Sequence, residues 1–294
     1  MDWPTVIYSE EAMREVFGIE DAGISLETRV DFLNSLSETG LKRISLGAFV
    51  SPRFVPQMAD FQELLKRVQP REGVQYLTFL HNKKARALAE QFSPPLTVED
   101  ELATLFIDIC DVHQRRNVNR SIAQAMEAWP EIILDAQQQG INKARVGIAS
   151  AWGSNFLGKF SQDYRLSFLE KQINLFRQAG IEVVEIGLHD SQSWCLPHEM
   201  EEDLKEIMNH WPEIKCFHLH MHDARAMALP SIYVALRTLS ADDTVILDGT
   251  LGGMGGGQYC GNGRASAMAA PPDAVERTPI PAMPTGRARG RVAG

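Results

Sequence analysis

Two histidines separated by one residue, His220 and His222, lie at the end of a run of mixed apolar and polar residues that begins at Ile214. Side chains alternate between the two faces of a strand, so both imidazoles point the same way, about 7 Å apart along the strand. Two neutral imidazoles on one face form half of a metal site. Histidines at this spacing can also simply line a buried sheet. The pattern alone leaves both interpretations open.

Composition narrows the class of protein. A chain of 294 residues with 44% hydrophobic and 23% charged residues is long enough for one (β/α) barrel or two ordinary domains. The formal charge of -9 and the pI near 5.4 argue against a nucleic-acid partner, because neutralising phosphates requires a basic face. No segment approaches about 18 consecutive apolar residues, and the first residues do not form a signal core. We therefore expect a soluble, cytoplasmic protein without a membrane partner.

The cysteines indicate a reducing environment. The chain contains four of them, Cys110, Cys195, Cys216 and Cys260, and none forms a CxxC pair with another. Cysteines so far apart in a chain of this length are more typical of a reduced cytosolic protein than of a disulfide framework.

Short β-rich runs alternate with longer amphipathic runs along the chain. Eight runs are predicted to be strands: residues 5–10, 42–48, 74–80, 102–109, 144–150, 181–187, 214–220 and 244–248. Seven runs between them are predicted to be helices: residues 27–38, 57–68, 82–91, 120–139, 162–178, 199–209 and 225–239. This order predicts a (β/α)8 TIM barrel, with a doubly wound open sheet as the alternative. Chemistry in such barrels lies at the carboxyl ends of the strands, where His220 and His222 end the seventh.

Five segments carry a resemblance to a known family. Residues 45–60, after the second predicted strand, resemble the corresponding segment of the 3-hydroxy-3-methylglutaryl-CoA (HMG-CoA) lyase family, barrel metallolyases that split hydroxyacyl-CoA thioesters. Four more segments, residues 115–122, 185–190, 220–223 and 252–256, match that family in the same order. A chance match to five ordered segments is implausible. The resemblance covers roughly residues 5–266.

The resemblance implies a site for a divalent cation, Mg²⁺ or Mn²⁺. The family holds its metal with an acidic residue after the first strand, two histidines of the seventh and an asparagine beyond a glycine-rich loop. The two histidines correspond here to His220 and His222, and the asparagine corresponds to Asn262. Counting back without gaps from the first predicted helix places the family's Arg-Asp pair on Arg14 and Glu15. A glutamate is one methylene longer but still offers a carboxylate oxygen to a hard cation. The alternative is that Glu15 is a solvated loop charge.

Two positions depart from the family pattern. Ser45 stands where the family has a glutamate on the second strand, and a hydroxyl cannot act as a carboxylate base. Gly257 stands at the position of the family's catalytic cysteine, and Cys260 offers a thiol three residues later. Cys260 either replaces that cysteine or packs as a small hydrophobic side chain.

After Ser266 the family pattern ends. Residues 267–294 are rich in proline, glycine and arginine, without an apolar stripe to bury, so we expect a disordered tail after a barrel domain of residues 1–266. The barrel would then have an incomplete carboxyl-terminal end. Without an eighth helix, apolar barrel surface would be exposed unless a second subunit covers it. We therefore expect a homo-oligomer, a dimer.

The resemblance implies a metal-dependent carbon–carbon lyase, an oxo-acid-lyase, that cleaves an HMG-CoA-like 3-hydroxyacyl-CoA to acetyl-CoA and an oxo acid. In this hypothesis Arg14 stabilises the enolate, Asp190 orients the site and Cys260 donates a proton. One alternative is a related barrel enzyme that condenses acetyl-CoA with a 2-oxo acid. Another is a catalytically silent barrel that binds acyl-CoA or metal, which Ser45 and Gly257 favour.

Overall fold

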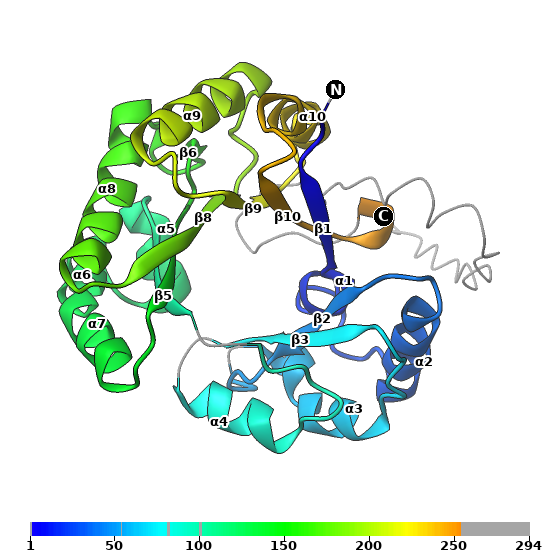
Figure 1. Cartoon of the computed structure of the whole chain (residues 1–294). Helices are drawn as coiled ribbons and strands as arrows, with labels where there is room; N and C mark the ends of the chain where they lie inside the picture. Colours follow the sequence, from blue (N-terminus) through cyan, green and yellow to red (C-terminus); the bar gives the residue numbers. More distant parts are fainter. Residues whose placement is uncertain (1, 54, 81–82, 100–101, 254–294) are drawn as a thin grey trace, which may run out of the picture.

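The computed structural model describes residues 2–53, 55–80, 83–99 and 102–253, and strands and helices alternate along them (Figure 1). The strands of the main sheet are β1 (Thr5–Glu10), β2 (Arg43–Ala48), β3 (Gln75–Phe79), β4 (Ala103–Asp108), β5 (Lys143–Ala149), β8 (Glu182–Asp190), β9 (Cys216–Met221) and β10 (Thr244–Gly249). A small antiparallel hairpin consists of β6 (Gly153–Ser154) and β7 (Gly158–Lys159). The α-helices are α1 (Ala12–Glu15), α2 (Leu26–Ser37), α3 (Phe61–Arg67), α4 (Lys83–Gln91), α5 (Asp111–Val118), α6 (Ile122–Glu127), α7 (Trp129–Gln138), α8 (Gln162–Gln178), α9 (Pro197–His210) and α10 (Ala228–Thr238).

The strand order identifies the architecture. The eight strands of the main sheet lie in the order β3-β2-β1-β10-β9-β8-β5-β4, and neighbouring strands are parallel. The first strand therefore pairs with the last, as in a barrel, whereas a doubly wound sheet keeps them apart. The strands curl around a common centre with helices outside (Figure 1), and β3 and β4 share no strand pairing within the described residues. The prediction of a TIM-barrel-like fold is confirmed, in the form of a half-barrel.

The predicted helix over residues 120–139 was wrong in detail. The segment forms two helices, α6 and α7, because Pro130 lies in the first turn of α7, where its missing N–H leaves no bond unmade. Ser121 caps α6 in a box with Gln124. Helix α5, which is short and polar, was not predicted from the sequence. It is followed by Asn119, which ends the helix in a left-handed conformation with a φ of 55°.

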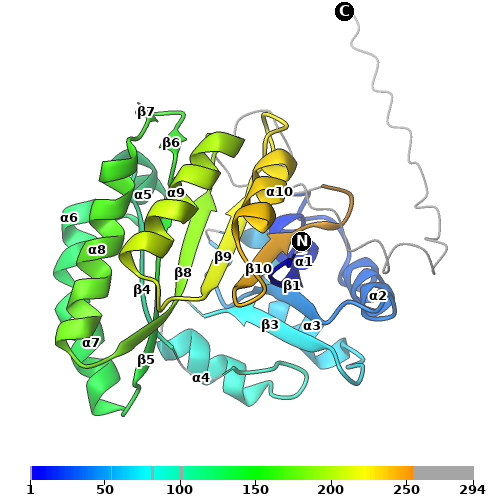
Figure 2. The same cartoon turned by 45° about the horizontal axis from the view of Figure 1, so that its top comes forward.

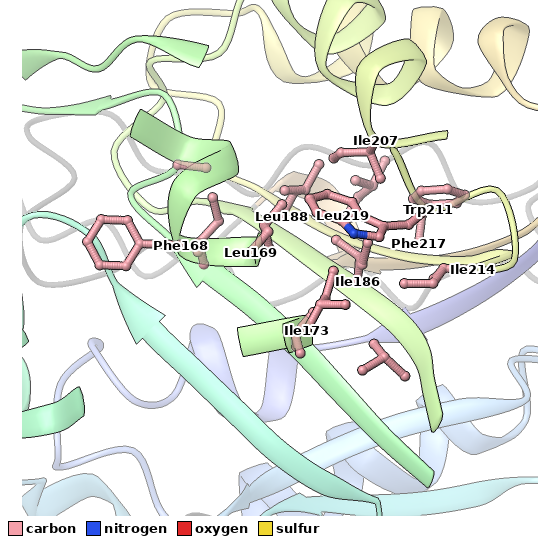
Figure 3. Close-up of a cluster of buried hydrophobic side chains, with 14 of the residues drawn as sticks. Phe168, Leu169, Ile173, Ile186, Leu188, Ile207, Trp211, Ile214, Phe217 and Leu219 are labelled. Carbon is pink, nitrogen blue, oxygen red and sulfur yellow. The ribbon is translucent and has the colours of Figure 1, made fainter. Parts of the chain in front are cut away.

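Two apolar clusters hold the sheet to its helices. The larger lies between the strands from β4 to β10 and helices α7 to α10, and the smaller lies between β1 to β3 and helices α2 and α3. Ile186 and Leu188 of β8 and Phe217 and Leu219 of β9 belong to the larger cluster (Figure 3). Complete burial of such side chains contributes about 1.5 to 3 kcal/mol each. Because the side-chain period is two, this packing directs the alternate residues of β8 and β9 into the barrel.

The carboxyl ends of the strands form the functional face. In Figure 2, β8 and β9 point toward the end of the molecule that carries the β6–β7 hairpin. Within the described part of the chain, each helix is too short or too polar to span a lipid bilayer. Asn262, Cys260 and Gly257 lie outside the described residues, as does the predicted boundary between a domain of residues 1–266 and a tail of residues 267–294. That division, the dimer and the cytoplasmic location stay predictions.

Candidate metal centre

Three potential metal ligands converge at the carboxyl ends of β1 and β9. Glu15, His220 and His222 each offer a ligand atom, and these atoms lie within 4.8 Å of one another. The Nε2 atoms of His220 and His222 are 3.1 Å apart, and His220 Nε2 lies 4.0 Å from Glu15 Oε1. Glu15 reaches this position because α1 begins directly after β1, which is separated from β9 by β10 alone. The structure thus brings together three of the four ligands predicted from the sequence.

The histidine tautomer suits metal binding. His220 Nδ1 lies 2.9 Å from Asp248 Oδ2. A carboxylate only accepts, so the Nδ1 of His220 carries a proton toward Asp248, and its Nε2 is the ring atom that faces His222 and Glu15. Burial alone would lower the pKa of His220, but Asp248 and Glu15 raise it. Burial and the charge of His220 lower the pKa of His222 to about 3, so His222 is neutral at neutral pH.

Glu15 is held as a carboxylate by its neighbours. Burial alone would raise its pKa, but Arg14, His220 and His222 outweigh that effect and lower it. The Arg14 guanidinium lies 2.9 Å from Glu15 and 2.6 Å from Glu11. The cation predicted to face the enolate is therefore adjacent to the metal ligands.

The donor set fits a divalent cation. Two imidazoles and one carboxylate are common ligands of divalent transition metals and leave room for further oxygen ligands. Ligands about 2.1 Å from a small ion and at right angles to each other are about 3 Å apart. The separation of 3.1 Å between the Nε2 atoms of His220 and His222 matches this value. These residues could therefore hold a divalent metal ion, and they do not select its identity.

Comparison with known proteins agrees with this geometry. The sequence profile named HMGL-like matches residues 9–271. The chain belongs to the HMGL-like family. Its resemblance to HMG-CoA lyases is confirmed: a hydroxymethylglutaryl-CoA lyase of Bacillus subtilis is 25% identical over 254 residues, which cover 86% of this chain and 79% of that protein.

Solved structures support the same fold. A Bacillus subtilis HMG-CoA lyase structure superimposes with a TM-score of 0.71 at 24% identity, covering 90% of this chain and 83% of that one. An HMG-CoA lyase from Acinetobacter baumannii, in complex with coenzyme A and 3-methylmalate, gives a TM-score of 0.68 at 23% identity and covers 89% and 79%. At these identities the structures establish the fold alone.

A charged network lies behind the HMGL-like metal centre. Asp248 Oδ1 lies 2.9 Å from His218 Nε2, as an ionic contact rather than an aligned hydrogen bond. His218 Nδ1 lies 3.4 Å from Glu185. Burial alone would lower the pKa of His218, but Asp248 and Glu185 raise it to about 10, so it is a cation at neutral pH. This cation keeps Asp248 ionised and available to His220.

This network was not predicted from the sequence. His218 shares its strand face with His220 and His222, so the period of two on β9 was the available signal. Asp248 pairs with His220 across the β9–β10 ladder, a register that no local pattern reveals.

Asp190 has a different environment from the one expected. Its carboxylate accepts hydrogen bonds from the backbone N–H groups of Trp194 and Cys195, both at 2.8 Å. Burial raises its pKa to about 6. The neighbouring residue His189 points into the barrel instead, with its ring 5.1 Å from that of His220. Asp190 thus organises the loop after β8, and its carbonyl accepts the His222 N–H at 3.3 Å.

Proposed function

We propose that this protein is a metal-dependent carbon–carbon lyase that cleaves a 3-hydroxyacyl-CoA of the HMG-CoA class to acetyl-CoA and an oxo acid. The observation that carries the proposal is the grouping of Glu15, His220 and His222, with Arg14 beside them, at the carboxyl ends of barrel strands. Relatives named as HMG-CoA lyases support the reaction class, and the complex of one such enzyme with coenzyme A supports an acyl-CoA substrate.

The proposed reaction combines the Lewis acidity of a bound cation with proton transfers to and from the substrate. A divalent cation held by Glu15, His220 and His222, Mg²⁺ or Mn²⁺ in our proposal, would supply Lewis acidity to the substrate's hydroxyl and an adjacent oxygen. The hydroxyl loses its proton to a base and becomes the new carbonyl. The bond between carbons 2 and 3 breaks, and its electron pair forms the enolate of acetyl-CoA. Protonation of that enolate at carbon completes the reaction.

Arg14 has the charge and position to stabilise the enolate. Burial opposes its positive charge, but Glu11 and Glu15 raise its pKa, so it remains a cation. A fixed cation aimed at a developing oxyanion lowers the barrier without reorganisation. Asn262 as a fourth ligand remains part of the proposal, and Cys260 is one candidate for the group that protonates the enolate.

The test is release of acetyl-CoA by the purified protein. The substrates are HMG-CoA, citramalyl-CoA and longer analogues, each with Mg²⁺, with Mn²⁺ and after treatment with a chelator. We expect metal-dependent release from at least one thioester and none from a His220→Ala control. No release from any of them would reject the lyase. Consumption of acetyl-CoA with a 2-oxo acid, without cleavage in the other direction, would identify a condensing enzyme instead.

A further inference from the structure

A second group of polar side chains lies on the functional face, around the end of β4. Leu105 and Ile107 of this strand belong to the outer core, whereas Phe106 contacts His189 inside the barrel. By the same alternation Asp108, the last residue of β4, faces the interior. Its carboxylate Oδ2 contacts Nδ1 of His113, on α5. Asp108 and His113 are both buried, so the pair is shielded from bulk solvent.

Other hydrogen bonds fix the orientation of this pair. Asp108 accepts from the Cys110 N–H at 2.9 Å and from the Ser150 hydroxyl at 3.1 Å. Because an ionised carboxylate can only accept hydrogen bonds, the Nδ1 of His113 must donate to Asp108 and therefore carries the proton. The Nε2 of His113 is then the basic nitrogen. The His113 ring stacks with Phe156, with centroids 6.4 Å apart. Asp108 and Phe156 together hold the imidazole in one orientation.

The pair lies at the same end of the barrel as the metal centre, at the carboxyl end of a strand. In the strand order β4-β5-β8-β9, two strands, β5 and β8, lie between β4 and β9 on one continuous sheet. The Ala151 N–H, beside Ser150, donates to the carbonyl of His189 at 3.1 Å.

Several other polar groups inside the barrel are poorly suited to proton transfer. The His189 ring is packed among the rings of Phe106, His220 and His218, at centroid distances of 4.6, 5.1 and 5.3 Å. The Glu10 carboxylate is occupied by the N–H groups of Ala12 and Leu251, at 2.8 and 3.0 Å. Glu15, His220 and His222 are taken up as metal ligands, and the Ser45 hydroxyl is too weak a base.

We propose that His113, oriented by Asp108, is the catalytic acid and base of the lyase reaction proposed above. His113 Nε2 accepts the proton of the substrate's hydroxyl, and the O–H electron pair becomes part of the new carbonyl. The electron pair of the broken carbon–carbon bond passes to the acetyl-CoA enolate. The protonated His113 then returns the proton to the enolate carbon. His113 ends neutral, so no external acid or base is consumed.

The test compares His113→Ala with His210→Ala, a control on the exposed end of α9. There His210 contacts the carbonyl and carboxylate of Glu206 and the ring of Trp211. We expect His113→Ala to lose about 10²- to 10⁴-fold in kcat. KM and Mn²⁺ affinity, measured by calorimetry, should stay at the parent values. Added imidazole should restore part of the lost kcat. The His210→Ala control should match the parent in every measurement.

A second variant tests the positioning role of Asp108. Asp108→Asn should lower kcat by a smaller factor than His113→Ala, because the imidazole remains but loses its charged partner, and imidazole should not rescue it. The inference would be overturned if His113→Ala kept the parent kcat, or if imidazole did not restore its lost kcat. In either case a parent protein that releases acetyl-CoA would still be a lyase. A parent protein without turnover on any thioester would overturn the proposed function and this inference together.

Discussion

The two sides of the barrel interior differ sharply in chemistry. The side formed by β8, β9 and β10 presents His189, His218, His220 and Asp248. Near the carboxyl ends of its strands, the side formed by β2 and β3 presents Ser45, Leu77 and Phe79, none of which ionises at neutral pH. Arg43 shares the face of Ser45 but lies at the amino end of β2, away from the functional face. The ionisable side is backed by the larger apolar cluster and the other side by the smaller one. Burying several charges is costly unless each is paired, so they gather where a rigid scaffold can fix their partners.

The largest expected effect is on the histidines of the ionisable side. His220→Ala or His222→Ala removes a ligand atom, and the remaining donors cannot replace it. Loss of a residue that hydrogen-bonds to a metal ligand typically lowers metal affinity roughly 10- to 100-fold, and we expect Mn²⁺ affinity to fall by more than that here. Calorimetric titration measures it, with circular dichroism to verify folding. Unchanged affinity in both variants would show that the two sides do not differ in metal binding.

A smaller effect on Mn²⁺ affinity is expected for Asp248, which contacts the ligand His220 rather than the metal. Asp248→Asn leaves His220 in place but removes the anion that holds its Nδ1 proton, so Mn²⁺ affinity should fall about 10- to 100-fold. The absorption spectrum of the Co²⁺-loaded protein should also change, because the orientation of His220 toward the ion is no longer fixed. A parent spectrum together with parent affinity would show that Asp248 only fills space.

The smallest effect is expected on the opposite side. Ser45→Ala removes at most one neutral hydrogen bond, worth about 0.5 to 1.5 kcal/mol, so kcat should fall by no more than about tenfold. Mn²⁺ affinity should not change. A loss of kcat as large as that expected of His113→Ala would mean that β2 still carries a catalytic group, and the contrast between the two sides would fail.

The strands and their order along the chain were predictable because they depend on local patterns. The predicted strands differ from the observed ones mainly at their ends, because the apolar pattern and the hydrogen bonding between strands do not stop at the same residue. Helix α5 was not predicted, since its short polar sequence has no apolar stripe. That omission also hid His113, which lies on α5 and contacts Asp108 five residues earlier.

The sequence by itself determined that His220 and His222 face the same way, because alternation along a strand is a property of one segment. The resemblance to the HMG-CoA lyase family placed the acidic ligand on Glu15. Its distance of 4.0 Å from His220 depends on the pairing of β1 with β10 and of β10 with β9. The contact between Asp248 and His220 likewise exists only across two strands. Only the tertiary structure decided these neighbours, because strand register is set by packing of the whole sheet against its helices rather than by local sequence.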